Sequence, residues 1–141
     1  MRLFSEAERQ QIVDRLRDMR NPVKIVYFTQ ELDCEACPVV RELLEDVVEL
    51  SDKLTLEIYN FHVDKDKVAQ YRVDKTPAII VEGAKDYGIR FYGLPAGFEF
   101  AALLEDILQV SQGRSNLQPE FVSRLADLKS PVHLEVLVTP T

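Results

Sequence analysis

The sequence contains few residues that bind metal ions. Its 141 residues include only two cysteines and two histidines. A structural zinc site takes four ligands, and His62 and His133 have no ligand-like spacing to each other. We therefore expect each histidine to be an ordinary surface or sheet residue, and the sequence predicts no metal site.

Long apolar runs and excess positive charge are also missing. No run is long enough to span a membrane, and residues 1–6 lack the apolar stretch of a signal peptide. The formal net charge of −7 argues against nucleic acid or an anionic membrane surface as a partner. Two closely spaced cysteines in such a chain fit a cytoplasmic redox protein better than a secreted disulfide scaffold.

With 46% hydrophobic residues, the chain has enough apolar side chains to bury the core of about one domain. Periodicity predicts helices at 5–19, about 35–50, 64–71 and 98–108, strands at 23–29, 54–63, 77–81 and 89–92, and a turn at 83–88. The two strand–helix–strand crossovers imply parallel pairing, and the short turn implies an antiparallel hairpin. The expected fold class is α/β, with a central mixed four-stranded sheet flanked by helices.

Both cysteines lie in the tetrapeptide Cys34-Glu35-Ala36-Cys37, between a strand and an amphipathic helix. Unsatisfied N–H groups and the helix dipole stabilise a thiolate at a helix N-terminus, where we expect Cys34. Cys37, one turn further, can reach back to form a small-ring disulfide. The spacing therefore favours a reversible dithiol, although two buried spectator cysteines, or a metal site formed across a dimer, are alternatives.

The end of the chain repeats its beginning. When residues 12–23 are laid over residues 121–132, six of the twelve positions are identical. Both segments read as an apolar-faced helix stopped by a proline and followed by a strand, so they predict an internal repeat. At this offset Thr141 matches Leu32, so the sequence stops two positions before the repeat would reach an equivalent of Cys34.

The order of these elements around Cys-x-x-Cys resembles the thioredoxin superfamily over roughly residues 23–110. A second motif supports the resemblance: the segment from Tyr71 to Ala78 contains Thr76-Pro77 before a strand. In the superfamily this proline is cis and packs beside the disulfide. The resemblance implies that the backbone of Thr76 faces outward, where an extended substrate peptide pairs with it. Gly93 also falls where thioredoxins have a glycine.

The sequence departs from thioredoxin itself at three places. Asp33 replaces a tryptophan, Glu35-Ala36 replaces Gly-Pro, and Phe28 replaces a buried acidic residue. The leading helix and the repeat instead resemble the two-unit, glutaredoxin-like protein disulfide oxidoreductases of thermophilic bacteria and archaea. The amino-terminal part of the alkyl hydroperoxide reductase flavoprotein has a similar double fold, with an inactive first unit.

On this resemblance, residues 1–112 form a thioredoxin-like unit with an active Cys-x-x-Cys. Residues 113–141 form a linker and the opening helix and strand of a second, truncated unit. The strand expected at 132–138 has Val132, Leu134, Val136 and Val138 on one face, so we expect it to pair within the chain or in a homodimer.

The resemblance implies a thiol–disulfide oxidoreductase. Cys34 and Cys37 are the expected catalytic residues, and Thr76 and Pro77 are expected to bind substrate. The implied partners are protein disulfides and a thiol or flavoprotein reductase, and no cofactor is expected beyond the Cys34–Cys37 disulfide. The competing reading is a thioredoxin-fold binding or scaffolding module with little redox activity of its own.

Overall fold

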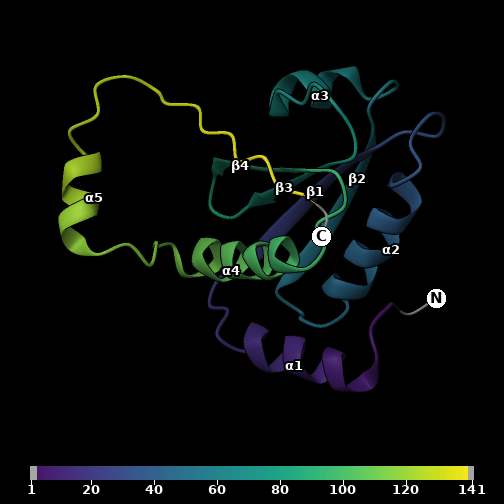
Figure 1. The fold of residues 1–141 in the computed structure, drawn as a ribbon, viewed down its shortest axis with the longest axis horizontal. Coiled ribbons are helices and arrows are strands. Elements are labelled where there is room, and N and C mark those ends of the chain that lie inside the picture. Colours follow the sequence, from purple (N-terminus) through teal and green to yellow (C-terminus); the bar gives the residue numbers. More distant parts are fainter. Residues whose placement is uncertain (1–2, 140–141) are drawn as a thin grey trace.

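The structure, a computed structural model, describes residues 3–139 (Figure 1). The elements run in the order α1 (Glu6–Leu16), β1 (Val23–Thr29), α2 (Cys37–Val48), β2 (Leu54–Asn60), α3 (Lys65–Tyr71), β3 (Ala78–Glu82), β4 (Asp86–Tyr92), α4 (Phe98–Gln112) and α5 (Pro119–Leu125). All the predicted helices and the first four predicted strands are present.

The four strands form one mixed sheet, as the sequence predicts, and their order in the sheet is β2-β1-β3-β4. β1 and β2 are parallel, with Val23 opposite Leu54 and Thr29 opposite Asn60. β3 and β4 form the expected antiparallel hairpin. β1 therefore lies inside the sheet, and its C-terminal end leads directly into the loop that carries Cys34.

The pairing of β3 corrects one prediction. β3 lies next to β1 and runs antiparallel to it, so the second crossover is not parallel. α3 has seven residues and spans about 10 Å, whereas a strand of seven residues such as β2 spans about 23 Å. α3 is thus too short to return the chain to the far end of the sheet. β3 consequently begins at the end where β1 and β2 finish.

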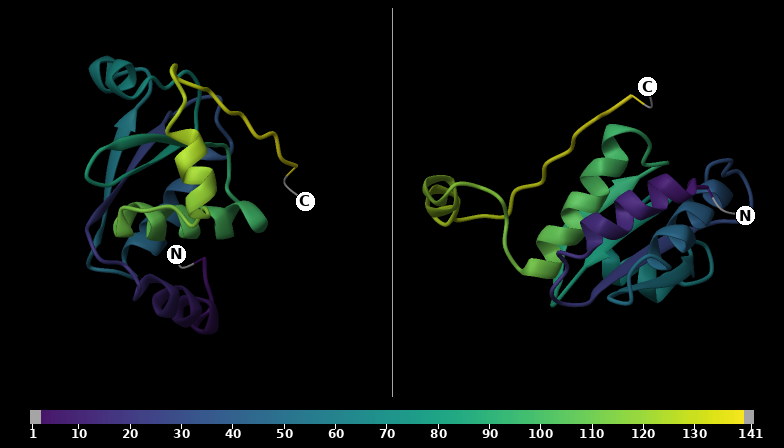
Figure 2. Two further views of the ribbon diagram at one scale, coloured as in Figure 1. Left: turned by 90° about the vertical axis from the view of Figure 1, so that its left-hand side faces the viewer. Right: turned by 90° about the horizontal axis from the view of Figure 1, so that it is seen from below.

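Alternate side chains of β1 enter two separate cores. Ile25 and Tyr27 pack with α1, α2 and α4 on one face of the sheet. Val26 and Phe28 pack on the other face, where α3 and the following loop contribute Tyr71 and Val73. Seen from below, α1 lies between α2 and α4 (Figure 2), so three helices cover one face and α3 covers the other.

The first helix begins where the sequence predicts. The Ser5 hydroxyl accepts a hydrogen bond from the Glu8 N–H, and the Glu8 carboxylate accepts one from the Ser5 N–H, which completes a capping box. Leu16 and Met19 are then buried against the sheet. α1 is therefore part of the same core as the rest of the unit.

The C-terminal extension differs from the prediction. α5 stands apart from the sheet, and residues 129–139 run back as an extended segment without strand pairing (Figure 1). The strand expected at 132–138 is thus absent, and pairing within the chain does not occur. The physical reason is that β1, its counterpart, is held between β2 and β3, and the extension brings no equivalents of those strands.

Candidate active site

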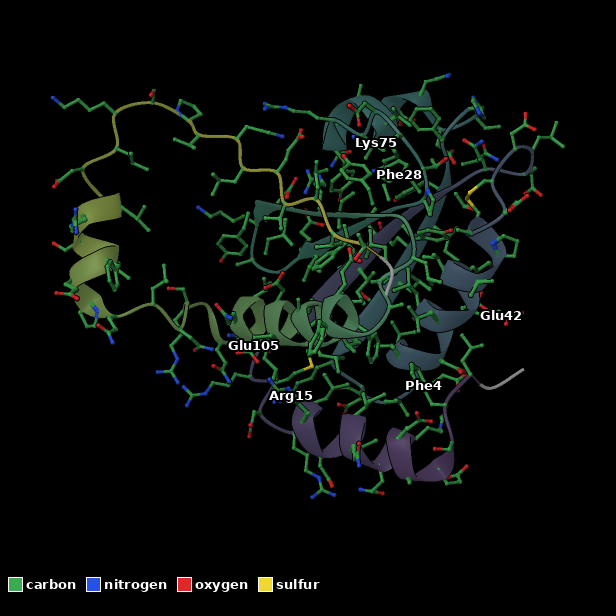
Figure 3. The ribbon with its side chains drawn as sticks, viewed as in Figure 1. Phe4, Arg15, Phe28, Glu42, Lys75 and Glu105 are labelled. Atoms are coloured by element: carbon green, nitrogen blue, oxygen red, sulfur yellow. A yellow bond between two sulfur atoms is a disulfide. The ribbon has the colours of Figure 1, made fainter. Side chains whose placement is uncertain are left out.

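Cys34 and Cys37 form a disulfide at the N-terminal end of α2, with their Cα atoms 5.4 Å apart (Figure 3). α2 begins at Cys37, and Cys34 lies two residues before the N-cap residue Ala36. Cys34 is partly exposed, whereas the side chain of Cys37 is only 1% exposed. One sulfur of the pair is therefore accessible to solvent and the other is shielded.

A side chain of β1 forms a hydrogen bond with the backbone of Cys37. The Tyr27 hydroxyl donates a hydrogen bond of 2.8 Å to the Cys37 carbonyl oxygen, and both residues are buried. Burial raises the pKa of Tyr27, so the hydroxyl stays protonated and keeps donating at neutral pH. This bond fixes the first turn of α2 to the centre of the sheet.

The Thr76-Pro77 peptide bond is cis, as the resemblance implies, and Pro77 is buried. The Thr76 hydroxyl donates a hydrogen bond of 2.6 Å to the side-chain oxygen of Gln30. Gln30 in turn donates 2.7 Å to the Leu32 carbonyl oxygen, two residues before Cys34. The structure thus links the loop of Thr76-Pro77 to the loop of the disulfide.

A third loop joins the same end of the sheet. Gly93 follows β4 with a φ of 87°, a backbone conformation that other residues rarely adopt. Its N–H donates a hydrogen bond of 3.0 Å to the Pro77 carbonyl oxygen. The glycine noted in the sequence therefore fixes the carbonyl side of Pro77, while the Thr76 side is held by Gln30.

The charges beside the disulfide are mainly acidic. Glu31, Asp33 and Glu35 are exposed in the loop around Cys34, and Leu32 between them is 78% exposed.

On the other face of the sheet, Phe28 occupies the position where thioredoxin has a buried acid. The centroid of its ring lies 5.6 Å from that of Tyr59 and 6.0 Å from that of Tyr71. That position therefore offers no carboxylate to take up a proton.

Within residues 3–139, no three His, Cys, Asp or Glu side chains gather into a group that could hold a metal ion. Over the same range, the helices are too short or too polar to cross a membrane. Two residues that shape the site, Tyr27 and Gln30, are not singled out by the sequence. Gln30 follows directly after a predicted strand, which is the one sequence signal that it belongs to the site.

Comparison with known proteins identifies the family. The model of the thioredoxin domain matches residues 22–105, which is more than half of the chain. This chain belongs to the thioredoxin domain family. A probable thioredoxin of Methanothermobacter marburgensis is 33% identical over 87 residues, which are 60% of this chain and 96% of that protein. The matched residues therefore contain the disulfide, the loop of Thr76-Pro77 and all four strands of the sheet.

Longer proteins also contain a similar domain. A protein disulfide oxidoreductase from Aeropyrum pernix is 31% identical, with a TM-score of 0.87, over 96% of this chain and 60% of its own. An alkyl hydroperoxide reductase protein of Staphylococcus epidermidis is 28% identical over 72% of this chain. The thioredoxin-domain chain spans only 18% of the length of that reductase protein. The family and the Cys34–Cys37 disulfide together support thiol–disulfide exchange.

Proposed function

We propose that this protein is a thiol–disulfide oxidoreductase that acts on protein disulfides through Cys34 and Cys37. The observation that carries the proposal is the disulfide itself, with one partly exposed and one buried sulfur at the start of a helix. A spectator pair would not need this difference in access. The proposal requires no cofactor beyond the dithiol.

In the reducing direction, the Cys34 thiolate attacks one sulfur of a substrate disulfide. A bond forms between Cys34 and that sulfur, and the other substrate sulfur leaves as a thiolate that takes up a proton. The Cys37 thiolate then attacks the Cys34 sulfur, which closes the Cys34–Cys37 disulfide and releases the second substrate thiolate. Two electrons thus pass from the dithiol to the substrate, which leaves as two thiols.

The loop geometry supports a protein as the substrate. Sheet pairing of β3 begins at Ala78, so the backbone of Thr76 takes no part in it and is available to an extended peptide. Leu32 offers an exposed apolar contact beside Cys34. The acidic residues of the same loop disfavour acidic partner surfaces, because like charges repel.

We further propose that a thiol or a flavoprotein reductase returns electrons to the disulfide, in the cytoplasm. The similarity to the alkyl hydroperoxide reductase protein supports a reductase partner in a redox relay. The similarity to the Aeropyrum oxidoreductase supports the glutaredoxin-like, two-unit class. That match covers 96% of this chain and therefore includes most of residues 113–139.

The extension itself supports a second unit. α1 ends at Leu16 and α5 ends at Leu125, which are equivalent positions of the repeat. The apolar residues of the first copy are almost fully buried, at 6% for Ile12, 3% for Leu16, 3% for Met19 and 1% for Val23. Their counterparts are open to solvent, at 45% for Phe121, 51% for Leu125, 57% for Leu128 and 60% for Val132. These exposed apolar residues need a core to cover them, either from a second unit or from a homodimer partner.

Insulin reduction by dithiothreitol tests the proposed activity. We expect the protein to accelerate the reaction and Cys34→Ser to abolish the acceleration. Cys37→Ser should retain the attacking thiol and accumulate a mixed disulfide with the substrate, visible on a non-reducing gel. If the wild-type protein and both variants give the same rate as dithiothreitol alone, the protein is a binding module and the proposal is wrong.

A further inference from the structure

Gln30 occupies the gap between the two loops of the site. It directly follows β1, which ends at Thr29, and its side chain is partly buried. The last residue pair that joins β1 to β3 is Phe28 with Ala78. Past that pair the two segments of the backbone separate, one leading toward Cys34 and the other toward Thr76. The Gln30 amide lies where they separate.

Both ends of this amide are used. Its oxygen accepts the hydrogen bond of 2.6 Å from the Thr76 hydroxyl. Its nitrogen donates 2.7 Å to the Leu32 carbonyl oxygen, with the Asp33 carbonyl oxygen 3.5 Å away. The amide thus uses its acceptor and its donor on two separate atoms, one toward each loop.

The loop that receives this donor needs support. Asp33, immediately before Cys34, has a φ of 56°, in the left-handed region that is unfavourable for most residues. Cys34 therefore follows a backbone turn whose carbonyl groups are held by Gln30. On the other side, the hydroxyl of Thr76 is the contact that holds the residue before the cis proline.

We propose that Gln30 is a positioning residue that holds the Cys34 loop at a fixed distance from the Thr76 backbone, and so sets the preference for protein over small disulfides. The inference rests on the proposed function. A protein substrate has to place its sulfur on Cys34 while its backbone lies along Thr76, so it requires the correct distance between the two loops. A small disulfide contacts only the Cys34 sulfur, so its reaction does not depend on the distance between the loops.

The matched variants remove the two hydrogen bonds separately. Gln30→Glu keeps an acceptor for Thr76 but has no donor for the Leu32 carbonyl oxygen at neutral pH. Thr76→Val keeps the shape of the side chain and removes the other hydrogen bond, and Thr76→Ser keeps the hydroxyl. Gln30→Leu removes both bonds at nearly constant volume.

The assay compares KM and kcat for insulin with the rate on bis(2-hydroxyethyl) disulfide. We expect Gln30→Glu and Thr76→Val each to raise the KM for insulin about fivefold, the equivalent of one net hydrogen bond, with little change in kcat. Gln30→Leu should raise it further, and in both Gln30 variants the rate on the small disulfide should change far less than kcat/KM for insulin. Thr76→Ser should restore most of the insulin KM that Thr76→Val loses.

Two results would overturn the inference. One is an unchanged insulin KM in Gln30→Leu, and the other is an equal loss on both substrates, which would indicate a general effect on the dithiol. If Gln30→Leu does not fold, the pair Thr76→Val and Thr76→Ser still decides, because equal insulin KM values for these two exclude a role for the hydroxyl bond. Failure of the proposed function has a separate signature, since the wild-type protein would then not reduce insulin at all.

Discussion

The reduced protein should react with iodoacetamide at Cys34 well before Cys37. To be alkylated, the Cys37 thiol has to leave a site where the residue is 1% exposed. That takes a local opening of the first turn of α2, which breaks the 2.8 Å hydrogen bond from the Tyr27 hydroxyl to the Cys37 carbonyl oxygen. The hydrogen bond contributes about 1 kcal/mol, and moving the buried thiol into water costs about another 1 kcal/mol. A local opening of about 2 kcal/mol makes Cys37 about 30-fold slower than Cys34, before the helix N-terminus adds its preference for a thiolate at Cys34.

Single-thiol variants allow each rate to be measured alone. Cys37→Ser leaves only the partly exposed sulfur, and Cys34→Ser leaves only the buried one, so mass spectrometry after timed quenching gives two separate rates. In concentrated urea the burial is lost and the two rates should converge. If Cys34→Ser labels as fast as Cys37→Ser under native conditions, the assignment of an attacking Cys34 and a resolving Cys37 is wrong.

Three further predictions concern Tyr27, Asp86 and the C-terminal extension. Tyr27→Phe should lower the free energy of unfolding by about 1 kcal/mol in urea titrations, because it removes a buried hydroxyl bond without changing the packing; a change near zero would refute a role for that bond. The hydrogen bond from Arg90 lowers the pKa of Asp86, so this carboxylate stabilises the fold at neutral pH and its contribution is lost as the pH falls through the acid range. Asp86→Asn should therefore flatten the loss of stability between neutral and acid pH, and an unchanged profile would contradict the reasoning. Deletion of residues 117–141 should leave insulin reduction and the unfolding midpoint nearly intact while changing solubility or oligomeric state, whereas loss of folding would show that the extension belongs to the first unit.

Much of the fold could be predicted because its signals are local. The capping box of Ser5 and Glu8, the buried run of β1 and the apolar stripe of α2 each specify one element without reference to the rest of the chain. The cysteine spacing and the Thr76-Pro77 motif indicate two loops that the structure links to each other through Gln30. These features depend on neighbours within a few residues, which a sequence displays directly.

The errors concern partners that lie far apart in the chain. The direction of β3 depends on the length of α3 compared with that of a strand, and the crossover pattern alone does not reveal it. Residues 132–138 alternate like a strand, yet an alternating pattern forms no strand without a neighbour to pair with. Gln30 is similar, because its role depends on Thr76, 46 positions away. Sequence patterns indicate which residues need partners, and the structure shows whether the partners are there.

The central place of β1 also determines where the molecule can fluctuate. β1 pairs on both sides, and five of its seven side chains are buried in the two cores. Its amide hydrogens should therefore be among the slowest in the molecule to exchange with deuterated solvent. The loop that begins at Gln30 continues directly from this strand, so protection should fall sharply within a few residues of Thr29. Opening and closing of the dithiol loop can then occur on a fast timescale while the backbone that anchors it exchanges only by global unfolding.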